Sequence, residues 1–177
     1  MSDFMTLSKI RQSCRNYQDK PIDHAVLEQI ISAAQRTPSA CNSQPWQFVV
    51  VESPDAVSQV AKAGQQLGIN AFLDDAKAFV IILEQHAVLM AKLRTFIDSQ
   101  YFAKGDIGAA AVTVCYAAAD AGVGSCIIGL YDRGAINELL DQPKDTRIGA
   151  LIALGYPKDD TIRDKVRKDQ TEAVRFI

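Results

Sequence analysis

The chain has 177 residues, of which 48% are hydrophobic and 23% are charged, as is typical of a folded globular protein. Its 19 lysines and arginines and 21 aspartates and glutamates leave a net charge of −2. The composition argues against extensive disorder, and the charge argues against a protein that wraps nucleic acid through a general positive field.

The first helix that the sequence predicts begins after residues 21–23 and ends near Arg36. Apolar residues recur there at helical spacing: Val26, Leu27, Ile30, Ile31 and Ala34. Asp23 is positioned to cap this helix, and Ile22 is positioned to pack onto Leu27 as a hydrophobic staple.

Three short, continuous apolar runs predict strands that are buried on both faces, at residues 48–51, 79–83 and 150–154. A helix is predicted to follow the first of them, because proline favours the first helical position and stands there as Pro54. The last four residues, 174–177, predict a terminal strand. So short a strand has to join a sheet, either in this chain or in a partner.

Two helices are predicted between the second and third strands, at residues 87–102 and 106–121. The second is rich in alanine and apolar nearly all round, which is typical of a helix in the middle of a structure. Its apolar run, 108–119, is shorter than the roughly 20 residues that span a bilayer, so we expect no membrane segment. With no basic-then-apolar leader, repeat or linker, we expect one α+β domain over residues 1–177.

The residues that usually mark metal and hydrolytic sites are few. None of the four cysteines stands in CxxC spacing, and the two histidines lie far apart, so we expect no metal site and no disulfide framework. This cysteine usage is typical of the reducing cytoplasm, where we expect the protein. No GxSxG, HExxH or P-loop motif occurs, and Gly122-Val123-Gly124 lacks the third glycine of a dinucleotide fingerprint.

The first of three unusual polar segments is residues 11–17. Arg11, Ser13 and Arg15 alternate, so that in an extended stretch all three point the same way. Two guanidinium groups and a hydroxyl on one face suit a phosphate monoester. The alternative, which the spacing alone favours, is a solvated basic turn after a short helix.

The second polar segment, residues 37–46, is the longest run of small polar residues and holds the only tryptophan. Loops on rigid scaffolds often carry function, so Ser39, Asn42 and Gln44 are candidates. A plain connecting loop, with the tryptophan packed on the core, is the alternative. The third segment, residues 163–168, is a basic cluster, for which an exposed charge run is the alternative.

Several motifs occur in a fixed order along the chain. Arg-x-Ser-x-Arg-x-Tyr stands at residues 11–17, and Pro-Ser-Ala-x-Asn-x-Gln-Pro-Trp stands at 38–46. Shorter blocks follow at 106–110, 122–129 and 154–157. In this combination and order the sequence resembles the nitroreductase family of FMN-dependent oxidoreductases, over nearly the whole chain.

The resemblance implies an α+β fold, with a mixed central sheet flanked by helices, and a homodimer with exchange of the C-terminal strand. Two FMN molecules would lie at the dimer interface, each touched by both chains. The alanine-rich helix from Asp106 would be the central helix of the dimer, and residues 174–177 would join the partner's sheet.

The resemblance also assigns residues to FMN binding. The phosphate site would be formed by Arg11, Gln12 (through its backbone), Ser13, Arg167 and Lys168. Arg15 would lie along the ribityl chain toward the pyrimidine edge of the flavin. The neighbouring subunit would contribute Pro38, Ser39, Ala40 and Asn42. One face and edge would be covered by Ile127, Ile128 and Gly129, with a backbone N–H near nitrogen N5.

Three features depart from the family's pattern. Gln12 stands where many members carry arginine, which lowers the charge of the anion site. Ile128 stands where some members carry glutamate. Residues 83–106 give no clear match to the helical excursion that shapes the family's substrate pocket. The resemblance therefore indicates the fold and the cofactor better than the substrate.

In the reaction that the resemblance implies, NADH or NADPH passes a hydride to flavin N5, and a small oxidised acceptor such as a nitroaromatic or a quinone follows at the same site. No side chain would act as a nucleophile. One alternative is a specialised flavin reaction, such as dehalogenation, flavin fragmentation or dehydrogenation, which would show poor NAD(P)H turnover despite bound FMN. The other is a non-catalytic FMN-binding protein, whose flavin would be closed to hydride donors.

Overall fold

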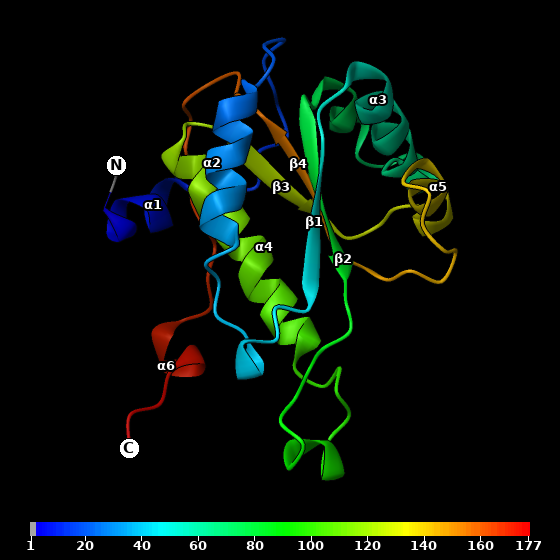
Figure 1. The fold of residues 1–177 in the computed structure, drawn as a ribbon. Coiled ribbons are helices and arrows are strands. Elements are labelled where there is room, and N and C mark those ends of the chain that lie inside the picture. The colour runs from blue at the N-terminus through cyan, green and yellow to red at the C-terminus, as the bar shows by residue number, and fades with distance from the viewer. Residues whose placement is uncertain (1–2) are drawn as a thin grey trace.

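The structure is a computed structural model that describes residues 3–177. Its centre is a four-stranded antiparallel sheet with the strand order β1-β2-β4-β3 (Figure 1). The strands are β1 (Trp46–Val51), β2 (Ala78–Glu84), β3 (Gly124–Ile128) and β4 (Ile148–Gly155). Because β2 and β4 are the inner strands, nearly all of their residues are buried.

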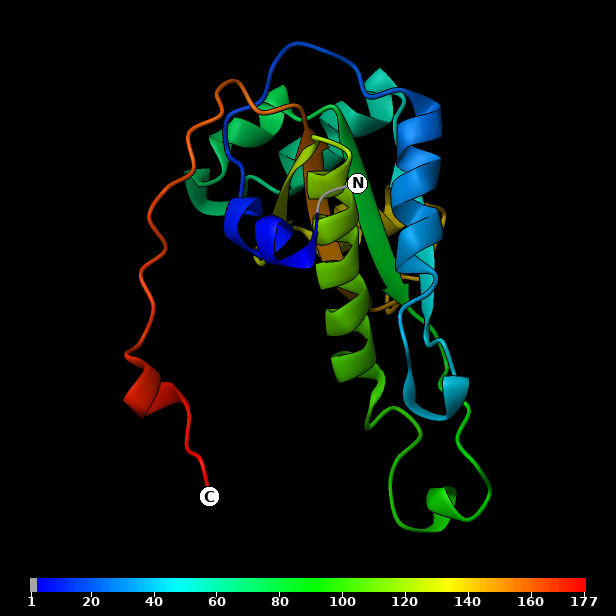
Figure 2. The ribbon, with the colours of Figure 1, turned by 90° about the vertical axis from the view of Figure 1, so that its left-hand side faces the viewer.

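Helices cover both faces of the sheet (Figures 1 and 2). One face is covered by α2 (His24–Ala34) and the long α4 (Ala103–Asp120). The other face is covered by α3 (Pro54–Ala63) and α5 (Arg133–Leu139). Two short helices lie near the chain ends, α1 (Phe4–Ile10) and α6 (Gln170–Ala173).

The alternation of side chains along β2 creates two apolar cores. Val80 belongs to the cluster that the sheet forms with α2 and α4, whereas Phe79 belongs to the cluster on the α3 side. Helices on both faces of a mostly antiparallel sheet confirm the predicted α+β class. Among residues 3–177, the parallel component of the sheet is one isolated bridge, which joins Ser13 to Ser125.

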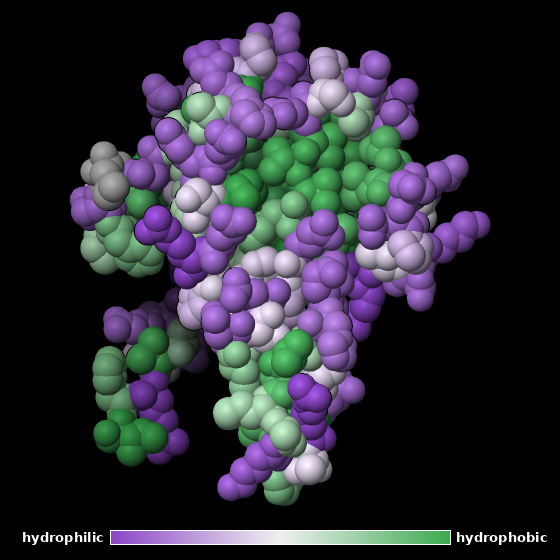
Figure 3. Space-filling view, in the orientation of Figure 1, coloured by the Kyte–Doolittle hydropathy of each residue, from purple (hydrophilic) through white to green (hydrophobic). Residues whose placement is uncertain are grey.

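Strand β1 differs from the predicted strand with two buried faces. Within the described residues it pairs only with β2, so it forms an edge of the sheet, and its middle residues are half-buried. Figure 3 shows a broad apolar surface between α2 and α3, over β1. An apolar run cannot distinguish an edge strand from a central strand, because the pattern is the same whether or not this chain supplies the cover.

The prediction of a helix at residues 87–102 is wrong. Residues 85–102 form an irregular lobe below the sheet in Figure 1, with one 3-10 turn at Leu93–Thr95. Val88, Met90 and Phe96 are exposed, so a helix here would have no core against which to pack an apolar stripe.

The helix predicted at residues 106–121 is confirmed as α4, which starts slightly earlier. At the start of α2, Asp23 occupies the N-cap position, but its side chain makes no capping hydrogen bond, so that prediction is wrong. Ile22 and Leu27 do belong to the same apolar cluster, as the predicted staple requires. The sequence patterns do not predict the short elements β3 and α5, while α1 is the short helix expected before residue 11.

The predicted strand at residues 174–177 forms no strand within the described chain. Val174 has extended backbone angles, φ −133° and ψ 135°, and Phe176 and Ile177 are almost wholly exposed. The segment extends away from the sheet (Figure 2), so its pairing with a partner stays a prediction. Among residues 3–177, no helix has the combined length and apolarity that crossing a membrane requires.

Candidate functional site

The N-terminal segment, residues 11–17, is extended and lies along the edge of β3. Ser13 forms a parallel bridge with Ser125, and Tyr17 forms an antiparallel bridge with Pro157. In such an extended stretch every second side chain faces the same way, which is the arrangement expected of the alternating arginines and serine.

Two glycines of the sheet make room for the N-terminal segment. Gly124 and Gly155 are cross-strand partners in β3 and β4. A Cβ at Gly124 would lie 2.8 Å from Cys14 Sγ, and a Cβ at Gly155 would lie 2.6 Å from Cδ1 of the Tyr17 ring. Side chains do not approach so closely, so the segment lies in a groove that only glycine leaves open. The motif blocks that contain these glycines therefore position the N-terminal segment.

Tyr17 anchors the end of this segment. Its side chain is completely buried, and its hydroxyl donates to the Cys14 carbonyl oxygen at 2.9 Å. Burial raises the pKa of the phenol far above its usual value, so the group stays a neutral donor. Because Cys14 and Tyr17 on either side of Arg15 are held in place, the position of the Arg15 backbone is fixed as well.

A hollow lined by cations lies beside the N-terminal segment. We call it the cationic hollow, and its lining residues are Arg11, Gln12, Ser13, Arg15, Arg163, Asp164, Lys165, Val166 and Arg167. Gln12 joins its two sides, because Gln12 Oε1 accepts from Arg163 N at 3.1 Å and Gln12 Nε2 donates to the Thr161 carbonyl at 2.7 Å. The Arg163 guanidinium also donates to the Ser13 carbonyl. The glutamine that departs from the family's arginine thus holds two segments together.

Within the described residues, the cations of this hollow form no ion pair with a carboxylate. The ion pairs recorded in the described part of the chain include none of them, and Asp164 is the only carboxylate of the lining. The pKa of Lys165 is lowered, first by partial burial and then by the positive charges of Arg11 and Arg167. A phosphate would relieve this repulsion and accept hydrogen bonds from several donors, so it fits the cationic hollow.

The cationic hollow contains Arg167 but not Lys168 among its lining residues. Two further cations of the basic cluster at residues 163–168, Arg163 and Lys165, line it as well. Their spacing could have revealed them. Arg163, Lys165 and Arg167 alternate along the chain, and an extended segment presents alternate side chains on one side.

Arg15 lies next to β3. Burial raises the pKa of the Cys126 thiol, and Arg15 and Ser13, which lie within reach of that thiol, oppose the rise. The following side chains alternate, with Ile127 46% exposed and Ile128 4% exposed. Because Ile128 packs in the core, only its backbone is available to a ligand, whereas Ile127 and the glycine after Ile128 are accessible.

The loop of residues 38–44 has its own hydrogen bonds. Ala40 N donates to the carboxylate of Asp106, in the first turn of α4, at 3.2 Å. Ser39 Oγ accepts from Gln44 N at 2.9 Å, which closes the loop on itself. A binding loop needs such a fixed shape.

The two parts of the predicted site lie at opposite ends of α4. The loop of residues 38–44 is tied to the first turn of this helix through Ala40. Ser13, in contrast, lies beside Ser125, which follows the last turn. The helix has 18 residues and is about 27 Å long, and Figure 2 shows the same separation. Both parts could therefore contact one ligand only if they came from two chains.

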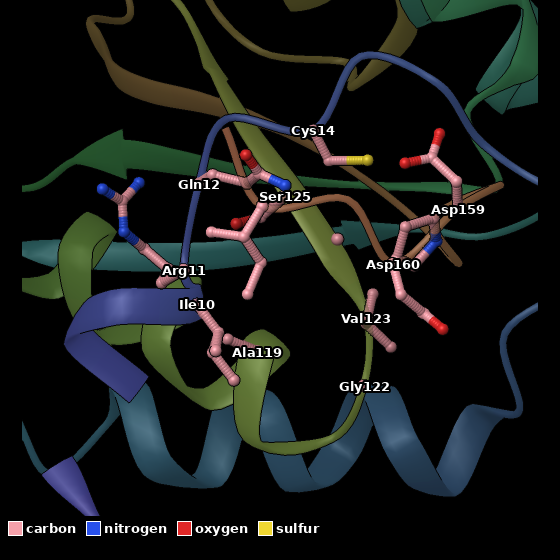
Figure 4. Close-up of a pocket in the computed structure, with 13 residues that line it drawn as sticks. Ile10, Arg11, Gln12, Cys14, Ala119, Gly122, Val123, Ser125, Asp159 and Asp160 are labelled. Carbon is pink, nitrogen blue, oxygen red and sulfur yellow. The ribbon is translucent and has the colours of Figure 1, made fainter. Parts of the chain in front are cut away.

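A second hollow lies next to the N-terminal segment and is shown in Figure 4. Ile10, Ala119 and Val123 contribute apolar surface, and the carboxylates of Asp159 and Asp160 stand at one side. These carboxylates would repel a phosphate, so the cationic hollow is the better anion site.

A sheet between two helical layers, with a cationic hollow at its edge, defines an α+β protein equipped to bind a phosphorylated ligand. The model of the nitroreductase family matches residues 9–156, which is most of the chain. The chain belongs to the nitroreductase family, and the family predicted from its motifs is confirmed, together with the fold and the enzyme class.

Individual relatives agree with this assignment. A protein of Archaeoglobus fulgidus, provisionally named as an NADH dehydrogenase/NAD(P)H nitroreductase, is 30% identical over 90% of this chain and 88% of its own length. The oxygen-insensitive NADPH nitroreductase of Helicobacter acinonychis is 26% identical over 94% and 93%, respectively. A crystal structure of an Exiguobacterium sibiricum protein in complex with FMN is 20% identical and covers 100% of this chain and 98% of that chain, with a TM-score of 0.85.

Proposed function

We propose that the chain is an FMN-dependent oxidoreductase that uses NADH or NADPH to reduce a small oxidised acceptor, such as a nitroaromatic compound or a quinone. The observation that carries the proposal is the cationic hollow beside residues 11–17, which fits the terminal phosphate of FMN. When bound, FMN would supply the redox chemistry by taking a hydride from the nicotinamide and giving it to the acceptor. The names of the relatives and the FMN complex of the Exiguobacterium protein support this assignment.

In this proposal the phosphate is held by the backbone of Gln12, whose side chain joins the two segments of the cationic hollow, and by side chains of both segments: Arg11, Ser13, Arg163, Lys165 and Arg167. Lys168 stays a predicted second clamp, which would have to reach the phosphate from outside the lining. Arg15 would lie at the pyrimidine edge, where its charge favours the gain of electrons by the bound cofactor.

The remaining predicted residues would enclose the ring system. From the same chain these are Ile127, Gly129 and the backbone of Ile128. From the partner subunit the loop of residues 38–44 would contribute its counterparts of Pro38, Ser39, Ala40 and Asn42. Water would be excluded by the apolar side chains, while the backbone N–H groups orient the ring.

We infer a homodimer in which each cofactor site is completed by both chains. The separation of the two parts of the site along α4 supports this inference. So do the open edge of β1 and the exposed residues 174–177, since each lacks a strand partner within the described chain. Deleting residues 174–177 should weaken both the dimer and the retention of FMN. A truncated or intact monomer that is stable at micromolar concentration and keeps its FMN would contradict the inference.

We also place the protein in the cytoplasm. The structure leaves four cysteines as free thiols: Cys14, Cys41, Cys115 and Cys126. Unpaired thiols are typical of a reducing compartment. Recovery of the protein from an exported fraction of its source cells would contradict this placement.

The test of the function uses the purified protein. We expect a yellow protein whose heat-released cofactor runs as FMN rather than FAD on chromatography. Anaerobic titration with NADH and with NADPH should bleach the flavin absorption, and one of the two should do so at lower concentration. Bound FMN that neither donor reduces would overturn the proposed reductase and favour a specialised flavin reaction or a binding protein. A cofactor that runs as FAD would overturn the assignment of the cationic hollow.

A further inference from the structure

The lobe of residues 85–102 connects β2 to α4 and extends beyond the end of the sheet (Figures 1 and 2). It lacks an α-helix and a strand, so it has few backbone hydrogen bonds of its own beyond the 3-10 turn at Leu93–Thr95. Its conformation therefore depends on contacts to the rest of the chain.

One side chain joins the two ends of this lobe. Gln100 Oε1 accepts from Ala87 N at 2.5 Å, and Gln100 Nε2 donates to the Gln85 carbonyl at 3.1 Å. The same Nε2 donates to Glu84 Oε1 at 2.9 Å, at the end of β2. A single amide thus closes the lobe where it leaves and re-enters the body of the protein.

The partner that Gln100 meets on the body is itself fixed. The side chain of Glu84 is only 7% exposed, and its Oε2 pairs with Arg147 Nε at 3.4 Å. Gln100 supplies the donor for the other carboxylate oxygen, which would otherwise lose a hydrogen bond in a largely buried place. We call the hydrogen bonds of Gln100 to Ala87, Gln85 and Glu84 the clasp. The clasp is therefore anchored in β2.

Another hydrogen bond, separate from those of Gln100, joins the lobe to the loop of residues 38–44. Val88 N donates to Ser43 Oγ at 2.7 Å. The same loop is tied to α4 through Ala40 and Asp106. Gln100, Val88 and the loop therefore form a continuous hydrogen-bonded unit at the first turn of α4.

The surface of this unit carries exposed apolar side chains among polar ones. Within the lobe, Ala87 and Leu89 are buried, whereas Met90, Phe96 and Tyr101 are 62%, 79% and 67% exposed. Ala87 and Leu89 hold the lobe near the body of the protein. The positions of the exposed side chains therefore depend on the hydrogen bonds of Gln100.

We propose that Gln100 is a positioning residue, which sets the lobe against the loop of residues 38–44 and thereby sets the wall that an electron acceptor contacts. The inference rests on the proposed function, in which that loop faces the flavin of the partner subunit. Gln100 itself does not touch the reacting groups. It acts by fixing where the exposed apolar side chains of the lobe stand relative to the loop.

The test compares Gln100→Met, which keeps the length of the side chain and removes its hydrogen bonds, with Gln29→Met on the exposed face of α2. Amide hydrogen exchange is measured on peptides that cover the lobe and the loop. We expect the Ala87 and Val88 amides to exchange roughly tenfold faster in Gln100→Met, and to be unchanged in Gln29→Met. The affinity for FMN should stay within about twofold of wild type, because the phosphate contacts of the cationic hollow are untouched and the loop of residues 38–44 keeps its own hydrogen bonds through Asp106 and Ser39.

Steady-state kinetics with 1,4-naphthoquinone as the probe acceptor give the second readout. We expect the KM for this quinone to rise about fivefold in Gln100→Met, with kcat changed by less than about twofold. Ser43→Ala removes the link between lobe and loop from the other side and should produce the same KM shift with Glu84 untouched. It also serves if Gln100→Met fails to fold.

Two results would overturn the proposal. In one, the backbone amides of the lobe exchange at the same rate in Gln100→Met, Gln29→Met and wild type, which would mean that the Gln100 side chain does not hold the lobe. In the other, exchange accelerates and KM for the quinone stays unchanged, so that the lobe does not contact the acceptor. A wild-type protein that binds no FMN would overturn the proposed function instead, while the exchange comparison would still decide whether Gln100 holds the lobe.

Discussion

The N-terminal segment and the lobe of residues 85–102 both lie at the margin of the sheet, but they are held in different ways. The N-terminal segment has backbone bridges to the sheet, a glycine groove and the buried ring of Tyr17. The lobe has one backbone hydrogen bond to the start of β1, from Gln85 N to the Pro45 carbonyl, and is otherwise held mainly by the side-chain hydrogen bonds of Gln100 and Ser43. The segment that would bind the cofactor is thus part of the folded body, while the segment that would meet the acceptor can vary at little cost in stability.

The largest effect is expected from Gly155→Ala, which tests the groove directly. The new methyl would lie 2.6 Å from the Tyr17 ring, and relief requires the N-terminal segment to leave its place. We expect the free energy of unfolding to fall by about 3 kcal/mol and FMN binding to be lost with it. Urea unfolding and a fluorescence titration with FMN measure the two effects.

A matched control for this substitution is Gly105→Ala near the start of α4. A Cβ there would meet nothing within 4 Å, so stability should stay within about 1 kcal/mol of wild type. If the two alanine variants had equal stability, the groove would not be what holds the N-terminal segment.

The second prediction concerns what the fixed segment holds. Arg11→Ala removes one cation from the hollow and should weaken FMN binding by roughly 1.5–3 kcal/mol, the usual contribution of a hydrogen bond to a charged group. Lys168→Ala, outside the lining of the hollow, should cost less than about 1 kcal/mol. Isothermal titration of the apoprotein with FMN checks both. A larger loss for Lys168 would move the phosphate away from the cationic hollow.

The third prediction places Arg15 at the ring rather than at the phosphate. Arg15→Gln keeps some hydrogen-bonding capacity and removes the charge, so the two-electron midpoint potential should fall by about 30 mV, which corresponds to about 1.4 kcal/mol. Spectroelectrochemical titration of both proteins, saturated with FMN, measures the shift. A weakened FMN affinity with an unchanged potential would assign Arg15 to the phosphate.

The smallest effect is expected in the lobe. Phe96 is 79% exposed, so Phe96→Ser should change the free energy of unfolding by no more than about 0.5 kcal/mol. The same urea titration as for Gly155→Ala gives the comparison. A loss near that of Gly155→Ala would mean that the lobe belongs to the folded body as firmly as the N-terminal segment does.

The inner part of the fold could be predicted from the sequence because its patterns are local. The apolar runs of β2 and β4 and the alanine-rich run of α4 each bury their own side chains in this chain. The sequence of the lobe predicts a helix because helix-forming residues are present, and the missing core contact is not visible in a sequence. The sequence does not predict strand β3, because its first residue, Gly124, has a low strand propensity and makes room for the neighbouring N-terminal segment.

Part of the candidate site could also be predicted from the sequence. The alternation of Arg11, Ser13 and Arg15 indicated one polar face, and the structure gives that stretch the extended backbone it needs. The same alternation in residues 163–167 does not by itself indicate a site, because a charge run is usually solvent-exposed. The bridging role of Gln12 depends on segments about 150 positions apart along the chain, which no local pattern reveals.

The open edge of β1 makes the newly synthesised chain prone to aggregate before it dimerises. Its residues, Trp46–Val51, carry no charge and no proline, and within the described residues the outer edge is paired with nothing. Such a segment is a template for intermolecular β-pairing, and identical copies can stack into insoluble aggregates. Until a strand from a second copy covers this edge, the protein would be prone to precipitate. Assembly would then protect solubility as well as complete a site, and a variant that assembles slowly would be found first in inclusion bodies.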